Sequence, residues 1–389
     1  MISVEEAKRL LMQHAPVCPA RTCALADAHL HALAQEVTAP YDHPLFDCSA
    51  VDGYAFAHDP QRSAYTIAGN IPAGSVLDHP LKPGECARIF TGAALPPGAD
   101  TVVMQEFCTV SGTDMQHADA KLRRGGNVRS RGEQVRAGEM VLEDGTVLDA
   151  AAIGLLASTG VRSVTVAQRP RVSVVITGDE FARTDPPEPG RIFNSNDVML
   201  ASALREQGFS PTVLRAADDP AQLRNVIEDA LRNSDLVLTT GGASVGDHDL
   251  VGPVLRDLHA DVHFHTVAQK PGKPMLFATC QGKPIIGLPG NPRAVLVLFH
   301  EYVRPFLRAM QGALGPWTPR TPLPMHHEVV LKGDRAEFRA ALVHEGRVFL
   351  LHDEGSHMLR SLVGATVIAY FPASVRALRA GDPVEVHFL

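Results

Sequence analysis

Two of the polar loops between residues 170 and 310 carry residue types suited to binding a metal and an anion. In the segment 177–180 a glycine is followed by two carboxylates, Asp179 and Glu180. Such oxygen ligands suit Mg²⁺, which usually takes one or two protein carboxylates together with phosphate oxygens. Four residues alone are still more typical of a solvated turn than of a metal site.

The segment 241–249 is a stronger signal, because it is rich in glycine and directly follows the apolar run 236–240. Glycines let several backbone amides converge on an anion. A serine hydroxyl could add a hydrogen bond and an aspartate could bind a metal. We therefore favour an anion-binding loop over a connector. The candidate residues are Gly241, Gly242, Ser244, Gly246 and Asp249.

Two further segments add basic groups and a helix start. Lys270 and Lys273 flank Pro271 and Gly272 in a stiff loop, which suits neutralising phosphate or another oxyanion, although an exposed turn explains the loop equally well. Pro289, Gly290 and Asn291 precede a predicted helix, whose first amides and dipole favour anions. Simple helix capping explains Asn291 as well.

Three polar segments lie in a different part of the chain. Asp52 falls within 47–54, Thr91 precedes Gly92, and Arg129 and Arg131 fall within 127–133. These groups could complete an anion site from another domain or subunit, although each segment alone is more typical of a turn. The chain has no lysine-containing phosphate loop and no His-Glu-x-x-His motif. This favours positioning and metal electrostatics over covalent catalysis.

The elements that must position the first four loops alternate between strand and helix. Short apolar runs at 172–176, 212–214, 236–240 and 284–288 predict strands, and helices are predicted at 196–207, from Pro220, and from Pro292 to about 310. Alternating strands and helices predict a parallel sheet covered on both faces. Ligands of such sheets bind beyond the carboxyl ends of the strands.

The rest of the chain predicts additional domains around this α/β domain. Residues 1–40 are predicted to be helical, opened by a capping box at Ser3 and Glu6. Short β runs follow to about residue 138, a helix is predicted at 149–159, and β runs return after Pro316. We expect a helical N-terminal domain (1–45 and 139–169), an inserted β-rich module (46–138), the α/β domain (170–312) and a C-terminal β domain (313–389).

Composition limits the partners. The 389 residues carry a formal net charge of -7, which argues against nucleic acid or an anionic membrane surface as the main partner. The six cysteines show no zinc spacing, and we expect no metal role for the histidines. The N-terminus lacks a signal-peptide pattern, and no apolar run approaches a membrane span. We expect a cytoplasmic protein.

Taken together, the polar segments resemble the molybdopterin molybdenumtransferase family, which includes MoeA and the gephyrin E domain. No single motif is specific, but the ordered set spans nearly the whole chain. The segments that carry the resemblance are 46–55, 91–93, 102–106, 127–133, 177–180, 241–249, 270–274, 288–292 and 355–357.

The resemblance implies a multidomain homodimer with a three-layer α/β molybdopterin-binding domain and a barrel-like C-terminal β domain. It implies a transferase that inserts molybdenum from molybdate into adenylylated molybdopterin and releases AMP, with Mg²⁺ as cofactor. Other cofactor-biosynthesis proteins or molybdoenzyme chaperones are further candidate partners. The essential polar residues it implies are Asp52, Thr91, Glu180, Asp218 and Asp249, with Ser356 among the substrate-binding residues.

From these positions we expect Glu180 and Asp249 to hold the metal, next to phosphate bound by the glycine loop. Lys270, Lys273, Arg129 and Arg131 would attract oxyanions. Four residues depart from the family pattern: Cys48 stands where asparagine is usual, Gln134 where aspartate is usual, and Arg293-Ala294 where Val-Ser is usual. The missing acid at Gln134 bears on metal or molybdate handling.

Two alternative functions stay open at this stage. One is a molybdopterin adenylyltransferase, which would share the α/β domain. The other is a non-catalytic dimeric scaffold of the same family. The additional β domains favour the molybdenum-inserting enzyme. The sequence does not separate molybdate from tungstate.

Overall fold

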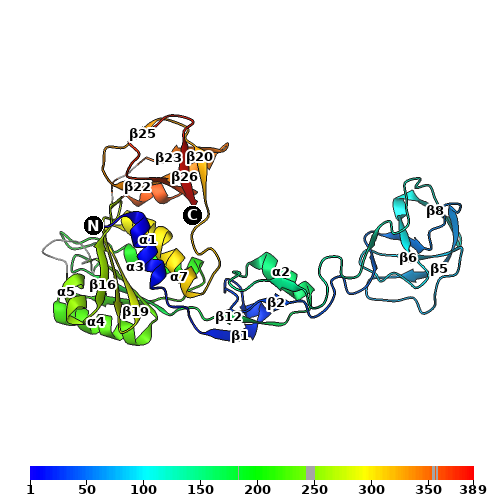
Figure 1. Ribbon diagram of the computed structural model, residues 1–389, viewed down its shortest axis with the longest axis horizontal. Coiled ribbons are helices and arrows are strands. Elements are labelled where there is room, and N and C mark those ends of the chain that lie inside the picture. Colours follow the sequence, from blue (N-terminus) through cyan, green and yellow to red (C-terminus); the bar gives the residue numbers. More distant parts are fainter. Residues whose placement is uncertain (183, 242–249, 353–354, 356–357) are drawn as a thin grey trace.

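The protein is elongated in the computed structural model, which describes residues 1–182, 184–241, 250–352, 355 and 358–389. An α/β domain and the C-terminal β domain lie together at one end of the molecule, and a β-rich module lies at the other (Figure 1). A small unit with one helix connects them. No helix within the described residues is both long and apolar enough to cross a membrane.

The α/β domain is built on a six-stranded sheet of order β14-β13-β15-β19-β18-β16. Its strands are β13 (Val172–Thr177), β14 (Thr212–Ala216), β15 (Leu236–Thr240), β16 (Asp261–Thr266), β18 (Pro274–Cys280) and β19 (Lys283–Leu288). The first three and β19 are parallel, whereas β18 runs antiparallel to both neighbours.

The predicted strands are parallel, as expected, but the sheet is not parallel throughout, because β18 runs antiparallel at one side. The physical reason is the connection between β18 and β19, which consists of only Gln281 and Gly282. Both residues have positive φ angles, 53° and 76°. A two-residue connection of this kind makes a hairpin, since a parallel pair needs a crossover of a dozen or more residues. The sequence analysis also missed β16 and β18.

Helices cover both faces of this sheet and bury two separate cores. One face packs against α1 (Val4–Gln13), α3 (Asn196–Glu206), α6 (Pro292–Leu298), the π-helical turn η3 (Phe299–Val303) and α7 (Arg304–Met310). The other face packs against α4 (Pro220–Asn233) and α5 (Val251–Asp257). Neighbouring residues of one strand, such as Val174 and Val175, belong to opposite cores. The predicted three-layer α/β arrangement is confirmed.

The N-terminal helix is shorter than predicted. The hydroxyl of Ser3 accepts the backbone N–H of Glu6 at 3.1 Å, so the predicted cap is present. The helix ends at Gln13, and the prediction of helix through residue 40 is wrong. Pro16 and Pro19 follow, and proline lacks the N–H that an inner helical turn needs. The chain then forms β1 (Ala20–Ala24), which pairs with β12 (Ser163–Ala167).

The connecting unit holds two short strand pairs and one helix. Besides β1 and β12 it contains η1 (Leu25–Asp27), β2 (Val37–Thr38), β11 (Met140–Leu142) and α2 (Ala150–Ser158). Asp149 caps α2 by accepting the N–H of Ala152 at 2.8 Å, as the predicted helix at 149–159 requires.

The β-rich module lies beyond this unit and contains a six-stranded sheet of order β7-β4-β6-β5-β9-β8. Its elements are β3 (Cys48–Ser49), β4 (Gly53–Phe56), β5 (Ala64–Ile71), β6 (Glu85–Ile89), β7 (Thr101–Met104), η2 (Gln105–Phe107), β8 (Cys108–Ser111), β9 (Asp114–His117) and β10 (Val128–Arg129).

The C-terminal domain is a curled β sheet that includes a strand of the α/β domain. The order is β17-β22-β24-β26-β20, with β23 paired to β22. A bridge between Met325 and Val348 brings the two ends of the sheet together, which gives the predicted barrel-like shape. Its elements are β17 (Gln269–Lys270), β20 (Arg320–Pro324), β21 (Val329–Val330), β22 (Ala336–His344), β23 (Arg347–Leu350), η4 (Leu359–Leu362), β24 (Val367–Phe371), β25 (Ala377–Leu378) and β26 (Pro383–Phe388).

Candidate functional site

The polar loops of the α/β domain lie along one edge of its sheet. β13, β14, β15 and β19 end at this edge. The antiparallel β18 begins there, because Leu276 is paired with Gly287 near the end of β19. Segments 178–180, 217–219, 241, 270–273 and 289–291 therefore share this edge, which we call the carboxyl edge.

One end of the carboxyl edge is acidic. Asp218, after β14, accepts the backbone N–H of Asp179 at 3.3 Å, so this carboxylate faces the loop that bears Glu180. The carbonyl of Glu180 accepts the N–H of Ile192 at 2.9 Å, which anchors that loop. Asp219, and not Asp218, caps α4 by accepting the N–H of Gln222 at 2.7 Å. Asp218 is therefore not needed as the helix cap.

This acidic end can be tested for its fit to Mg²⁺. Within the described part of the chain, no group of three or more His, Cys, Asp or Glu side chains is placed to hold a metal. Glu180 and Asp218 come from adjacent strand ends, and two carboxylates suffice for Mg²⁺ when phosphate and water complete its shell. The predicted ligand Asp249 lies outside the described residues, as do Gly242, Ser244, Gly246 and Ser356.

The middle of the edge is fixed by a glycine and a buried amide. Gly241 has a φ of +84°, and a Cβ there would lie 2.6 Å from both the carbonyl oxygen and the hydroxyl of Thr177. Asn196, only 5% exposed, donates to the Thr240 hydroxyl at 3.0 Å and to the Gly290 carbonyl at 2.8 Å. This side chain ties the start of the glycine loop to the 289–291 turn. Sequence reasoning took Asn196 only as a helix start.

The other end of the edge is a basic pocket of about 460 Å³ between the α/β domain and the C-terminal domain. Lys270, Lys273, Pro289, Gly290 and Asn291 all line it, so the structure brings these predicted residues together. We call it the basic pocket. Its described cationic lining residues are Lys270, Lys273, Arg293, Arg335 and Arg339, against one carboxylate, Glu337.

The C-terminal domain supplies pocket residues that the sequence analysis missed. Arg335 donates to the Gln269 carbonyl at 3.2 Å, and Arg339 forms an ion pair of 2.7 Å with Glu337. Strand β17 pairs with β22, so both domains share a backbone ladder beside the pocket. The run 335–340 alternates strictly between charged and apolar residues, a period-two pattern that predicts a strand with Arg335 and Arg339 on one face.

A second polar site lies on the β-rich module. One carboxylate oxygen of Asp52 accepts both the N–H of Thr91 at 2.8 Å and its hydroxyl at 2.7 Å. These two hydrogen bonds hold the pKa of Asp52 below its ordinary value. Arg88, also missed from sequence, lies over the rings of Tyr54 and Phe90 at 5.2 and 4.8 Å and adds positive charge nearby. Asp52 is thus a fixed, ionised acceptor.

The two predicted arginines lie on β10 of this module and just after it. Arg129 is on β10, opposite Cys48 of β3. The guanidinium of Arg131 pairs with Asp42, and its backbone N–H donates to Asp47 at 2.7 Å. Within one chain the module lies at the opposite end of the molecule from the carboxyl edge (Figure 1). The structure therefore does not bring Asp52, Thr91, Arg129 or Arg131 to the carboxyl edge of the same chain.

Three family models match most of the chain. Residues 2–160 match the MoeA N-terminal region (domain I and II), residues 173–309 a probable molybdopterin binding domain, and residues 322–389 the MoeA C-terminal region (domain IV).

Individual relatives agree with these matches. The chain is 34% identical to molybdopterin molybdenumtransferase 2 of Mycobacterium tuberculosis, with 99% of each chain covered. It is 35% identical to the molybdopterin molybdenumtransferase of a Nostoc species, covering 91% of this chain and 85% of that relative. The crystal structure of the molybdopterin biosynthesis protein MoeA from Pyrococcus horikoshii superposes with a TM-score of 0.82 at 26% identity, and each chain is covered completely. The chain therefore belongs to the molybdopterin molybdenumtransferase (MoeA) family.

Proposed function

We propose that this protein inserts molybdenum from molybdate into adenylylated molybdopterin and releases AMP, as a step in molybdenum cofactor biosynthesis. The observation that carries the proposal is the two-ended carboxyl edge, which has carboxylates at one end and a basic pocket at the other. The family membership and the names of the relatives support the same reaction.

The basic pocket suits the tetrahedral dianion molybdate. Charge-assisted hydrogen bonds from lysine and arginine to an oxyanion are short and strong. Lys270 and Lys273 are exposed at the pocket mouth, whereas Arg335 is fixed by the Gln269 carbonyl. Gly290 and Asn291 add backbone N–H groups just before the start of α6. The pocket is therefore proposed to receive molybdate and to hold it for transfer.

The acidic end suits the pyrophosphate of an adenylylated pterin together with Mg²⁺. Bound there, the metal would offset phosphate charge, and Glu180 and Asp218 are the described residues that would hold it. Strand spacing puts β13 and β18 roughly 14 Å apart, because three neighbour steps of about 4.8 Å separate them. A ligand that reaches both ends must be long, as adenylylated molybdopterin is.

Asp52 and Thr91 are proposed to act on a neighbouring chain in a homodimer. The Asp52 carboxylate is ionised and is held in place by two hydrogen bonds from Thr91. The rest of the candidate site, however, lies at the far end of the same chain (Figure 1). Closed two-fold dimers are the commonest assembly of soluble proteins, and their symmetry would create two equal sites. Arg129 and Arg131 would then approach the phosphates from the partner copy.

The direct test is to incubate the purified chain with adenylylated molybdopterin, molybdate and Mg²⁺. We expect AMP release together with pterin-bound molybdenum, and both should depend on molybdate. Formation of the adenylate from molybdopterin and ATP would instead identify an adenylyltransferase. The absence of any turnover would leave the scaffold function.

A further inference from the structure

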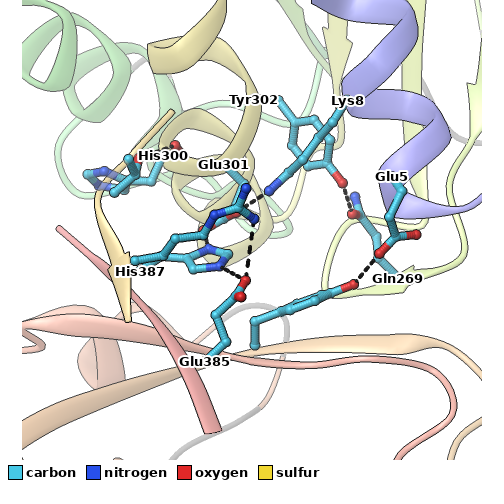
Figure 2. Close-up of polar contacts among 11 residues, drawn as sticks. Glu5, Lys8, Gln269, His300, Glu301, Tyr302, Glu385 and His387 are labelled. Carbon is cyan, nitrogen blue, oxygen red and sulfur yellow. Dashed lines mark hydrogen bonds and ion pairs between the residues drawn. The ribbon is translucent and has the colours of Figure 1, made fainter. Parts of the chain in front are cut away.

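A buried ionic cluster lies behind the basic pocket, outside the site described above. Its members are Lys8 of α1, Glu301 of the π-helical turn, and Glu385 and His387 of β26, and we call it the Glu301 cluster. Lys8 Nζ lies 2.8 Å from one oxygen of Glu301, and His387 Nδ1 lies 2.7 Å from the other. Figure 2 shows His387 between the carboxylates of Glu301 and Glu385, with Lys8 approaching Glu301 from α1.

The centre of this cluster is deeply buried, and the cluster joins segments that are far apart in the sequence. The side chain of Glu301 is 2% exposed and that of His387 5%. Removing one member of a buried charged group leaves its partner uncompensated, which strongly disfavours the arrangement that the group holds. Here the fixed arrangement is that of α1 and the C-terminal domain against η3. One-turn π-helical segments of this kind are frequently found at functional sites.

Two contact paths lead from the cluster to the wall of the basic pocket. In the first, the hydroxyl of Tyr302, next to Glu301, donates to the side-chain oxygen of Gln269. The amide of Gln269 then donates to the Gly272 carbonyl at 2.9 Å. Gln269 directly precedes Lys270, and Gly272 directly precedes Lys273. This path therefore fixes the backbone from which the two lysine side chains enter the pocket.

The second path runs through stacked rings. His387 stacks on Tyr370 with ring centroids 5.7 Å apart, and Tyr370 stacks on Phe338 at 5.0 Å. Phe338 lines the pocket between Glu337 and Arg339. The hydroxyl of Tyr370 also donates to Glu5 of α1 at 2.7 Å. Strand β22, which carries Arg339, is therefore held in place by ring contacts that lead to His387 of the same cluster.

We propose that the Glu301 cluster is a positioning device for oxyanion binding, which holds Lys270 and Lys273 of the α/β domain in register with Arg335 and Arg339 of the C-terminal domain. This inference rests on the proposed function, since it takes molybdate as the ligand of the pocket. Glu301 acts through its neighbours and does not itself line the pocket.

Binding of molybdate alone to the full-length chain, measured by isothermal titration, tests the ligand part. Glu301→Ala breaks both ion pairs, and we expect about tenfold weaker molybdate binding by chains that remain folded. Glu301→Gln keeps an oxygen for Lys8 and an N–H for a neutral His387, so binding should match that of the unaltered chain. Tyr302→Phe removes only the hydroxyl on the first path, and about threefold weaker binding is expected.

A matched control separates positioning from general stability. Ile227 of α4 is fully buried in the core on the other face of the sheet. Ile227→Ala should lower the melting temperature about as much as Glu301→Ala and leave molybdate binding unchanged. Equal weakening by both variants would mean that the effect is only loss of stability, and the proposal would fall.

Two measurements report on the junction between the α/β domain and the C-terminal domain in the absence of ligand. Trp317 is the single tryptophan, and Lys8 Nζ lies 5.3 Å from its ring, so its emission should shift in Glu301→Ala and not in Ile227→Ala. The Ala336 N–H donates to the Ala268 carbonyl at 3.0 Å across the junction. Hydrogen exchange at Ala336 should be faster in Glu301→Ala.

The failures of the two proposals can be told apart. If the unaltered chain binds molybdate and folded Glu301→Ala and Tyr302→Phe bind it equally well, with unchanged exchange at Ala336, the positioning role is overturned. If Lys270→Ala/Lys273→Ala binds molybdate as tightly as the unaltered chain, the pocket assignment fails. That result would contradict the proposed molybdate site, and it would also contradict the claim that the Glu301 cluster positions residues for molybdate.

Discussion

The carboxyl edge and the Asp52–Thr91 pair present opposite solutions to holding polar groups in place. The edge is built from loops that are far apart in the sequence, and the buried Asn196 links two of them by hydrogen bonds. At one end it forms a pocket that the C-terminal domain also lines. The Asp52–Thr91 pair needs only two neighbouring strands, because Gly53 of β4 pairs with Ile89 of β6. It is rigid but partly exposed to solvent.

This difference suggests different roles for the two regions: the carboxyl edge would bind a ligand by itself, and the Asp52–Thr91 pair would need a second surface. A pocket with buried support can take a ligand by itself. An exposed, ionised carboxylate with an adjacent hydroxyl needs a second surface before it can act on a substrate. This contrast supports our proposal that the two regions are halves of a site that two copies of the chain assemble.

The largest expected effect is on turnover by Asp52→Asn. Asparagine keeps the oxygen that accepts from Thr91 and loses only the charge. We expect AMP release to fall by about 10² to 10³-fold, as for the loss of one pre-positioned electrostatic group. Molybdate binding to the basic pocket should not change. A parallel loss of molybdate binding would show that the two regions are not separate.

Acid should next weaken the Glu301 cluster, which supports the basic pocket at one end of the carboxyl edge. Burial opposes ionisation of Glu301, but Lys8 and His387 hold its pKa at about 2, below the ordinary value of 4.5. A lowered folded-state pKa stabilises the protein above about pH 4.5, and this contribution is lost as the pH falls towards 2. The shift corresponds to about 3 kcal/mol. Melting temperatures between pH 6 and pH 3 should fall less steeply for Glu301→Gln than for the unaltered chain; identical slopes would contradict this assignment.

A smaller effect is expected when the two lysines of the basic pocket are removed. Lys270→Ala/Lys273→Ala should weaken molybdate binding by about 10 to 100-fold, since a hydrogen bond to a charged group contributes about 1.5–3 kcal/mol. With saturating molybdate, AMP release should recover most of its rate. Steady-state kinetics will check this, because a defect in kcat that molybdate cannot overcome would place the lysines in the transfer step.

The smallest effect compares one glycine from each region. Gly241 and Gly92 have nearly the same φ, +84° and +81°, so alanine carries a similar conformational cost at both positions, about 1 kcal/mol or more. At Gly241 the new Cβ would also meet Thr177 at 2.6 Å, whereas at Gly92 nothing lies within 4 Å. Chemical unfolding should show Gly241→Ala to be the less stable variant. Equal losses would mean that the edge can relax around Gly241.

Local patterns predicted much of the fold. The cap at Ser3, the helices from 149 and from Pro220 and the parallel strands from Val172 to Leu288 are present, because each depends on residues close in sequence. The antiparallel β18 escaped prediction, since strand direction depends on the short turn at Gln281. Lys270, Lys273 and 289–291 were recognised as polar loops, yet nothing local showed that they share one pocket.

The remaining parts of the site depend on contacts between domains. Arg335 and Arg339 belong to the pocket only because β22 pairs with β17 across the junction. Asn196 matters because its amide reaches Thr240 and Gly290, both far away in sequence. The separation of Asp52 and Thr91 from the carboxyl edge is a property of the elongated shape (Figure 1). Such placements are not encoded in any short segment.

The most direct test of the central claim is complementation between two inactive chains. Asp52→Asn and Glu180→Gln should each be nearly inactive alone. After co-expression with two different affinity tags, about a quarter of the normal AMP release should return, because random pairing gives half heterodimers with one intact site of two. Purified heterodimers with no activity would contradict a site shared between copies.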